Sequence, residues 1–168
     1  MTRPVEIVRW EALEQPEWSY QGRTEKMGRD ADYGRHFGFD RLGLHHVRLA
    51  PGHRTSLPHA ESAEDEFVLV LEGAPDLWLD GALHRLGPGD AVGFKAGTGV
   101  AHSFLNNTAS DVRLLVAGDR PRPENRVIYP VDPDRKPLRS DWWDDAPTRP
   151  LGPHDGLTDQ ARAAQAQR

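Results

Sequence analysis

Histidine and carboxylate side chains gather in one stretch of the sequence, at spacings that suit metal chemistry. His59 and Glu61 are two positions apart, so on a strand both side chains point to the same face. Glu66 then opens an apolar run, and His102 opens a later one. In a small barrel the starts of neighbouring strands converge, and imidazole nitrogens meeting carboxylate oxygens there would form a site for a divalent transition metal. The spacing predicts His59, Glu61, Glu66 and His102 as the metal ligands.

The absence of cysteine limits the metal to nitrogen and oxygen ligands. The chain has no Cys and eight His, seven of which lie between His36 and His102. Disulfides, zinc fingers, iron–sulfur clusters and cysteine nucleophiles are therefore excluded. A site made of two imidazoles and carboxylates favours Zn, Fe, Mn or Ni over Cu, although the sequence does not select among these four.

Glu61 has three possible roles. It is a fourth ligand, or it is a general base that leaves a triad of two histidines and one carboxylate, or no metal binds at all. Three residues are candidates for lining a substrate pocket: His45, His46 and Arg48. His45 and His46 are adjacent, so on a strand only one of them faces inward, and His46 shares its face with Arg48.

Length and charge restrict the class of protein. The 168 residues are the usual length of one domain, which we expect to span residues 1–168. The chain has 21 basic and 26 acidic residues, a net charge of −5, which argues against nucleic acid as a partner. No apolar stretch is long enough to span a membrane, and residues 1–10 do not resemble a secretory signal. We therefore expect a cytoplasmic protein with a small-molecule partner.

Short apolar runs separated by Gly and Pro turns predict an all-β fold. The run Glu66–Glu72 is apolar almost throughout, which is typical of a strand covered on both faces. Asp80-Gly81 is a strong signal for a two-residue hairpin turn. Strands at this spacing are typical of a sandwich or barrel. We predict strands over residues 42–49, 66–72, 77–79, 82–86, 91–94, 102–106 and 112–117.

The two ends are predicted to be extended arms. Residues 1–41 form an N-terminal extension with a possible strand at 5–8, and residues 118–168 form a Pro-rich C-terminal arm with a possible strand at 126–129. The pair Trp142-Trp143 is expected to pack on the barrel or on a second subunit, since each indole buries a large area. The Ala-rich end, 158–168, is short and polar and is predicted to fray.

The first cluster of site residues resembles a motif of the cupin superfamily. That motif is a Gly, a short spacer, His-x-His, three or four residues, Glu, six residues and Gly. Here Gly52 is followed by six residues, His59-Ala60-Glu61, four residues, Glu66, six residues and Gly73. Glu61 stands where the motif has its second His.

The second cupin motif is matched less fully. His102 and Asn106 have the spacing of its His and Asn, and the turn at Gly89 also matches. Lys95 stands where the motif has Pro, and Gly97-Thr98-Gly99 lengthens the turn before His102 by two residues. The resemblance covers about residues 42–117.

The resemblance implies a cupin-type double-stranded β-helix, or jelly-roll barrel, that holds a divalent metal. On this basis we expect a small metalloenzyme that uses the metal as a Lewis acid in isomerase or lyase chemistry on a sugar or carboxylic acid. An Fe(II) dioxygenase and a non-catalytic small-ligand sensor are the alternatives, since this fold hosts many functions. Cupin barrels often pair, so a homodimer is predicted, with the arm that carries Trp142 and Trp143 across the partner.

Overall fold

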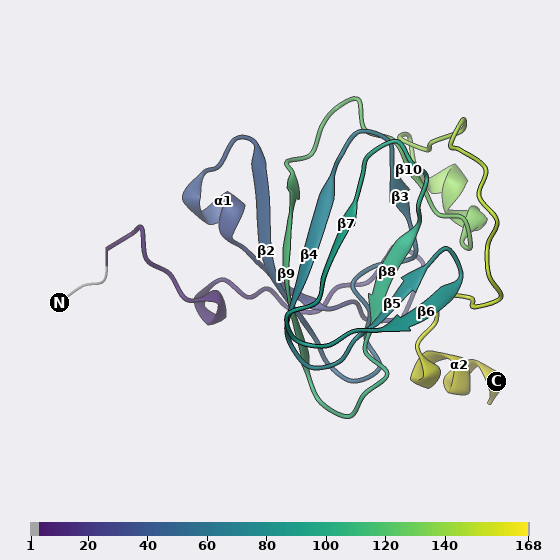
Figure 1. The fold of residues 1–168 in the computed structure, drawn as a ribbon, viewed down its shortest axis with the longest axis horizontal. Helices are drawn as coiled ribbons and strands as arrows, with labels where there is room; N and C mark the ends of the chain where they lie inside the picture. Colours follow the sequence, from purple (N-terminus) through teal and green to yellow (C-terminus); the bar gives the residue numbers. More distant parts are fainter. Residues whose placement is uncertain (1–3, 168) are drawn as a thin grey trace.

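The computed structural model describes residues 4–167, and they form two facing antiparallel sheets (Figure 1). Within these residues the larger sheet has the order β1-β2-β9-β4-β7 and the smaller one β6-β5-β8, with a short pair β10-β3. The position of β9 between β2 and β4 gives the crossed connectivity of a jelly roll. The predicted all-β class is confirmed. The strands are β1 (Arg29–Asp32), β2 (Leu42–Leu49), β3 (Ala60–Glu61), β4 (Glu66–Glu72), β5 (Asp76–Leu79), β6 (Ala82–Arg85), β7 (Ala91–Phe94), β8 (His102–Leu105), β9 (Val112–Asp119) and β10 (Val127–Ile128).

Strand β4 shows how the sequence directs the larger sheet. Val68 and Val70 are 1% and 2% exposed and face the smaller sheet, whereas Phe67 and Leu71 are 44% and 43% exposed. The apolar run predicts a strand covered on both faces, but only alternate residues are buried. The reason is that β4 belongs to an antiparallel sheet, and the face of this sheet that carries Phe67 and Leu71 is partly exposed to solvent.

The hairpin between β5 and β6 has the predicted turn. Asp80 and Gly81 both have positive φ, 45° and 87°, as a type I′ turn requires. β5 is central in the smaller sheet and pairs with β8 on its other side.

The core lies between the two sheets. Its side chains come from both, so burying them holds the sheets face to face. The buried members are Leu49, Val68, Val70, Leu77, Phe94, Phe104, Val112 and Leu114.

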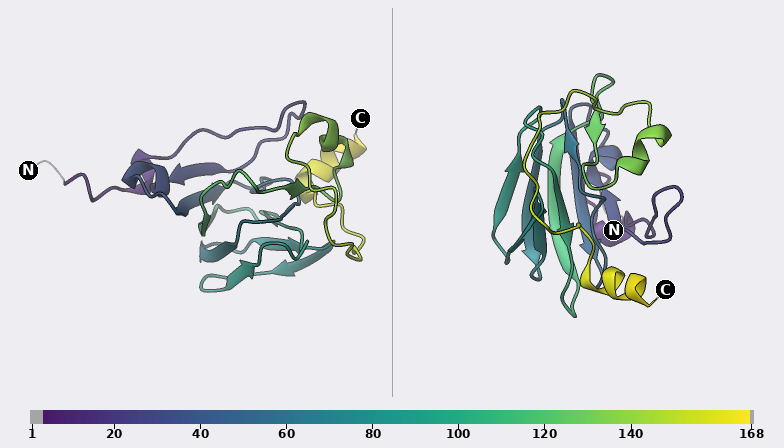
Figure 2. Two further views of the ribbon diagram at one scale, coloured as in Figure 1. Left: turned by 90° about the horizontal axis from the view of Figure 1, so that it is seen from above. Right: turned by 90° about the vertical axis from the view of Figure 1, so that its right-hand side faces the viewer.

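The N-terminal segment runs along the larger sheet. Residues 5–8 form no strand, contrary to the possible strand there, and a 3-10 turn, η1 (Trp10–Ala12), follows them. β1 then pairs antiparallel with β2, and the short helix α1 (Tyr33–Phe37) leads into β2. Residues 4–9 extend away from the sheets, as the left view of Figure 2 shows.

The C-terminal arm packs on its own chain. Trp143 is 8% exposed and joins Trp78, Ala101 and Leu105 in a second apolar cluster, so the predicted packing on the barrel is confirmed for this residue. The possible strand at 126–129 is the short β10, which is followed by the 3-10 helix η2 (Pro133–Leu138).

The chain end forms a helix, contrary to the predicted fraying. In α2 (Asp159–Ala166), the Thr158 side chain accepts a hydrogen bond from the Ala161 amide and donates one to the Gly52 carbonyl at 2.9 Å. This tertiary bond fixes the helix start on the barrel. Arg168 lies outside the described residues. No helix within residues 4–167 has the length and apolar character needed to cross a membrane.

Candidate functional site

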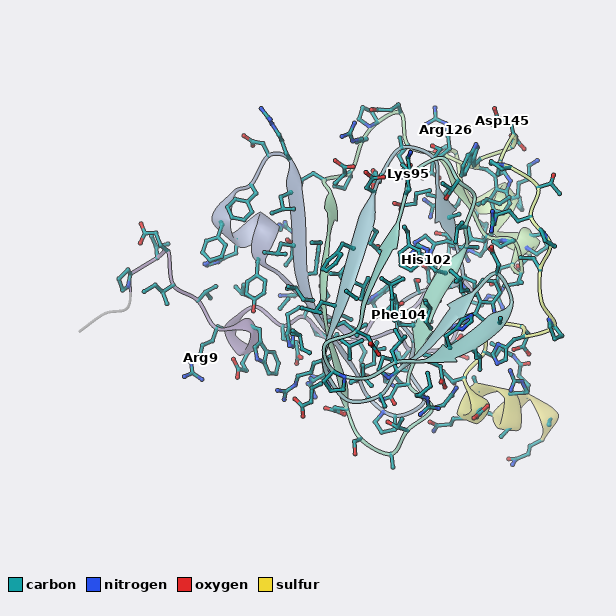
Figure 3. The ribbon with its side chains drawn as sticks, viewed as in Figure 1. Arg9, Lys95, His102, Phe104, Arg126 and Asp145 are labelled. Atoms are coloured by element: carbon teal, nitrogen blue, oxygen red, sulfur yellow. The ribbon has the colours of Figure 1, made fainter. Side chains whose placement is uncertain are left out.

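His59, Glu66 and His102 line one cavity of about 410 Å³ between the sheets. His59 and His102 lie opposite each other because their backbones exchange two hydrogen bonds, with N···O distances of 3.2 and 2.9 Å. Their ring centroids are 4.9 Å apart. His102 Nε2 is 3.1 Å from Glu66 Oε1. The structure thus brings together three of the four residues predicted as ligands, and Figure 3 shows His102 and Phe104 in the middle of the molecule.

The ring of His59 is held in one orientation and one tautomer. Its Nδ1 is 3.0 Å from the Leu57 carbonyl oxygen and 3.2 Å from Ser56 Oγ. A carbonyl only accepts, so Nδ1 carries the proton and Nε2 keeps its lone pair. Burial, reinforced by the neighbouring His102, lowers the pKa of His59 to about 4. The ring is therefore neutral at pH 7 and can donate a lone pair to a cation.

Glu66 supplies the negative charge of this group. Burial alone would raise its pKa, but the hydrogen bond from His102 lowers it below the usual value. Glu66 is therefore a carboxylate at neutral pH. The ring of His102 lies flat against Phe94, with centroids 3.5 Å apart, which fixes its orientation.

The donor chemistry of these residues fits a divalent transition metal, but they bond to each other in this structure. Two imidazoles and one carboxylate are a common donor set for such an ion. Nδ1 of His102 is buried without a hydrogen-bond partner, so this ring is not fully paired by the protein. Within residues 4–167, no three or more His, Asp or Glu side chains are already grouped as an ion would need.

Glu61 faces an adjoining smaller cavity of about 110 Å³, which shares His45 and Glu66 with the first. Burial, followed by the negative charges of Glu64 and Glu66, raises the pKa of Glu61 to about 8. The carboxyl is therefore close to the predicted ligands but does not line their cavity. Its role as ligand or base stays a prediction.

The adjacent histidines of β2 point to opposite faces of the sheet. His45 lines the cavity, and its Nδ1 is 3.0 Å from Asp30 Oδ1. His46 and Arg48, the alternative pocket pair, face the outside. His46 stacks on Trp10 with ring centroids 4.4 Å apart, and so neither residue reaches the cavity.

Three further residues of the cavity, Trp18, Gly28 and Asp30, come from the N-terminal extension and were not predicted. Trp18 and Asp30 both line its wall. Asp30 is placed by the pairing of β1 with β2, in which it lies opposite Val47. No motif or spacing marks any of the three, because their place depends on contacts far along the chain.

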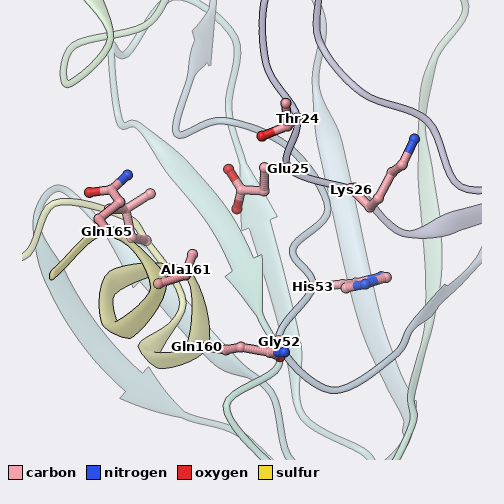
Figure 4. Close-up of a pocket in the computed structure, with 10 residues that line it drawn as sticks. Thr24, Glu25, Lys26, Gly52, His53, Gln160, Ala161 and Gln165 are labelled. Atoms are coloured by element: carbon pink, nitrogen blue, oxygen red, sulfur yellow. The ribbon is translucent and has the colours of Figure 1, made fainter. Parts of the chain in front are cut away.

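A second cavity lies on the surface beside α2, away from the candidate ligands (Figure 4). It measures about 280 Å³ and is lined by Glu25, His53 and Gln160, among others. None of the predicted metal ligands lines it, so we place the candidate site in the larger, interior cavity.

Fold and site together define a two-sheet β-barrel with a His and Glu cluster in its interior. The family model of the cupin domain matches residues 45–118, which include His59, Glu66 and His102. The resemblance to the cupin superfamily predicted from the sequence is thus supported for residues 45–118. No curated protein sequence gives a significant match to the chain.

Solved structures agree with this family. A cupin-superfamily sugar phosphate isomerase from Silicibacter pomeroyi is 37% identical, with a TM-score of 0.59, over 61% of this chain and 64% of that one. A structure from Acidithiobacillus ferrooxidans, provisionally given the same activity, is 30% identical with the same TM-score, over 61% and 65%. The chain thus spans slightly less than two thirds of the length of either structure.

A third structure extends the likeness in fold. The polyketide cyclase RemF from Streptomyces resistomycificus has a TM-score of 0.60 over 84% of this chain and 96% of its own, at 22% identity. At that identity the likeness concerns the fold alone, which is shared by proteins of different chemistry.

Proposed function

We propose that this chain is a metal-dependent cupin enzyme that carries out isomerase or lyase chemistry on a small polar molecule, a sugar or a carboxylic acid. The observation that carries the proposal is the meeting of His59, Glu66 and His102 in one interior cavity large enough for a small ligand. The similarity to a cupin-superfamily sugar phosphate isomerase supports the same class of reaction.

His59, Glu66 and His102 would hold the ion, with Glu61 as a possible fourth ligand. The ion would supply a Lewis acid that polarises a substrate oxygen. The protein contributes orientation, because the Leu57 carbonyl holds the His59 ring and Phe94 holds the His102 ring. Glu61, if it stays free of the ion, is the carboxyl group that would move a proton between substrate atoms, and its pKa of about 8 keeps a proton on it at pH 7.

Two other functions remain as alternatives. A triad of two histidines and one carboxylate is also the ligand set of non-haem Fe(II) oxygenases, so a dioxygenase is one. The direct hydrogen bond between His102 Nε2 and Glu66 favours the other, a binding module without catalysis, since these two atoms are paired without an ion. Turnover in a substrate screen with added Mn, Fe, Zn and Ni would separate an enzyme from a binding module.

The metal site is tested by elemental analysis of the purified chain. We expect one divalent ion per chain in the wild type and its loss in His102→Ala and His59→Ala, because each removes one nitrogen donor. His84→Ala is the matched control, since His84 is exposed on β6, outside the cavity. Glu66→Gln, which keeps the shape of the side chain, should lower the metal content as well.

Retention of one ion per chain in His102→Ala would contradict the assignment. Far-UV circular dichroism of each variant separates loss of metal from loss of fold. The homodimer also stays a prediction. Because Trp143 packs on its own chain, the arm no longer gives a reason for it, and a monomeric mass by light scattering would contradict it.

A further inference from the structure

The walls of the interior cavity differ sharply from its polar end. Its apolar side chains come from both sheets and from the N-terminal segment: Trp18, Val47, Val68, Phe104 and Val116. His59, Glu66 and His102 gather together, as their mutual distances show. A ligand whose polar group meets these three residues would therefore place a large part of its remaining surface against hydrocarbon.

The polar side chains along the walls are already paired within the protein. Thr55 Oγ1 accepts a hydrogen bond from the Phe104 amide at 3.1 Å. Ser56 Oγ is 3.2 Å from His59 Nδ1, and Asp30 is bonded to His45. A sugar would bring several hydroxyl groups, and these side chains have only part of their hydrogen-bonding capacity left for them.

The charge of the cavity also disfavours a phosphate group. Asp30 and Glu66 contribute carboxylates to the lining, and no Lys or Arg among residues 4–167 contributes to it. Phosphate recognition in proteins uses Arg, Lys or helix N-termini. Arg35 and Arg120 line an adjoining outer cavity, which shares His45 with this one and also holds Asp32, Glu64 and Asp119.

Trp18 gives the cavity an aromatic wall. Its backbone carbonyl accepts a hydrogen bond from the Met27 amide at 2.8 Å, and its ring contacts Tyr20 with centroids 4.7 Å apart. The side chain is thus held in place, yet it stays 43% exposed although it is large and apolar. A fixed, exposed indole at a cavity wall is a surface on which a flat apolar ligand can stack.

We propose that the substrate of this site is a carboxylic acid with an aromatic or otherwise apolar body, and not a phosphorylated sugar. This inference rests on the proposed function, and of the two substrate classes named there it selects the carboxylic acid. With a divalent ion bound, which offsets the charge of Glu66, the substrate carboxylate would face His59, Glu66 and His102. The apolar body would lie between Trp18 and the valines of β2, β4 and β9.

The test measures binding of two probes by isothermal titration calorimetry. The full chain is titrated with 2-naphthoate and with glucose 6-phosphate, after Zn²⁺ has been added and its content measured. We expect 2-naphthoate to bind at least about tenfold more tightly than glucose 6-phosphate. Trp18→Ala should weaken naphthoate binding about tenfold, and Trp18→Phe should restore most of it, since the stacking surface returns.

Trp10→Ala is the matched control, because Trp10 lies on the outer face of the sheet against His46. Tighter binding of glucose 6-phosphate, binding of neither probe, or equal losses in the Trp18 and Trp10 variants would each overturn the inference. Glucose 6-phosphate binding that Arg120→Ala weakens would place a phosphate site in the outer cavity and would also overturn it. If the chain binds naphthoate but no metal, only the metal site is contradicted. If it binds metal but no naphthoate, only the substrate class is contradicted.

Discussion

The two faces of the five-stranded sheet are built from alternate residues of the same strands, yet one lines the cavity and the other is covered by the N-terminal segment. On β2, His45 and Val47 face the cavity, whereas His46 and Arg48 face outward. The inner face joins apolar walls to a polar site. On the outer face, Trp10 stacks on His46, and the guanidinium carbon of Arg113 on β9 lies 4.9 Å from the centroid of the Trp10 ring. We call these three residues the outer clamp.

The N-terminal segment links the two faces. Glu14 accepts two hydrogen bonds from Arg48 on the outside, each of 2.7 Å, and Trp18 a few residues later lines the cavity on the inside. The segment therefore belongs to the site even though it lies outside residues 45–118, the part that matches the cupin domain. Part of the cavity lining therefore comes from a segment outside the region that resembles other cupins.

The largest expected difference between the faces is in packing, at two neighbouring leucines of β9. Leu114 is fully buried on the inner face, and Leu115 is partly exposed on the outer face. Leu114→Ala should lower the free energy of unfolding by about 2–5 kcal/mol, because it leaves a cavity in the core. Leu115→Ala makes the same chemical change and should cost clearly less. Urea denaturation of both variants measures this, and equal losses would refute the assignment of faces.

The outer clamp should contribute to stability without contributing to the site. Trp10→Ala removes the stacking on His46 and the contact with the Arg113 guanidinium, and we expect a loss of roughly 1–3 kcal/mol in unfolding free energy. Metal content should stay at the wild-type value, because Trp10 does not line the cavity. Ile7→Ala, at an exposed position in the same segment, is the control and should change little. Loss of metal in Trp10→Ala would show that the two faces are coupled.

The strands could be predicted from the sequence because their signals are local. The predicted bounds 42–49, 66–72 and 91–94 agree with β2, β4 and β7 at both ends, since apolar alternation and Gly or Pro turns define them. The spacing of His59, Glu66 and His102 likewise suggests a common site, and the structure brings them to one cavity.

The rest of the site depends on contacts that are distant in the sequence. Parity shows that His45 and His46 face opposite ways, but the choice between them is made by Trp10, which covers one face of β2. Helix α2 was expected to fray because its residues are polar and few. It is held by the hydrogen bond from Thr158 to Gly52, which no local pattern reveals.

The smallest expected effect concerns the response of the outer face to acid. Burial, followed by the charge of Arg113, lowers the pKa of His46 below its usual value, against the opposing effects of Glu14 and Glu11. The unfolded chain therefore takes up this proton more readily than the folded one. The stability that depends on neutral His46 is fully present above about pH 6.5, the unfolded value, and is lost as the pH falls below it.

His46→Phe keeps a ring against Trp10 but cannot be protonated, so its unfolding free energy should fall less between pH 7 and pH 5.5 than that of the wild type. Urea denaturation across this range measures the two slopes. His84→Phe, at an exposed position of β6, should keep the wild-type slope. If the slopes of the His46→Phe variant and of the wild type are equal, protonation of His46 does not destabilise its contact with Trp10. The acid sensitivity would then belong to the inner face, where His59 also has a lowered pKa, of about 4. Its loss of stability begins at the same pH of about 6.5 and continues down to about pH 4.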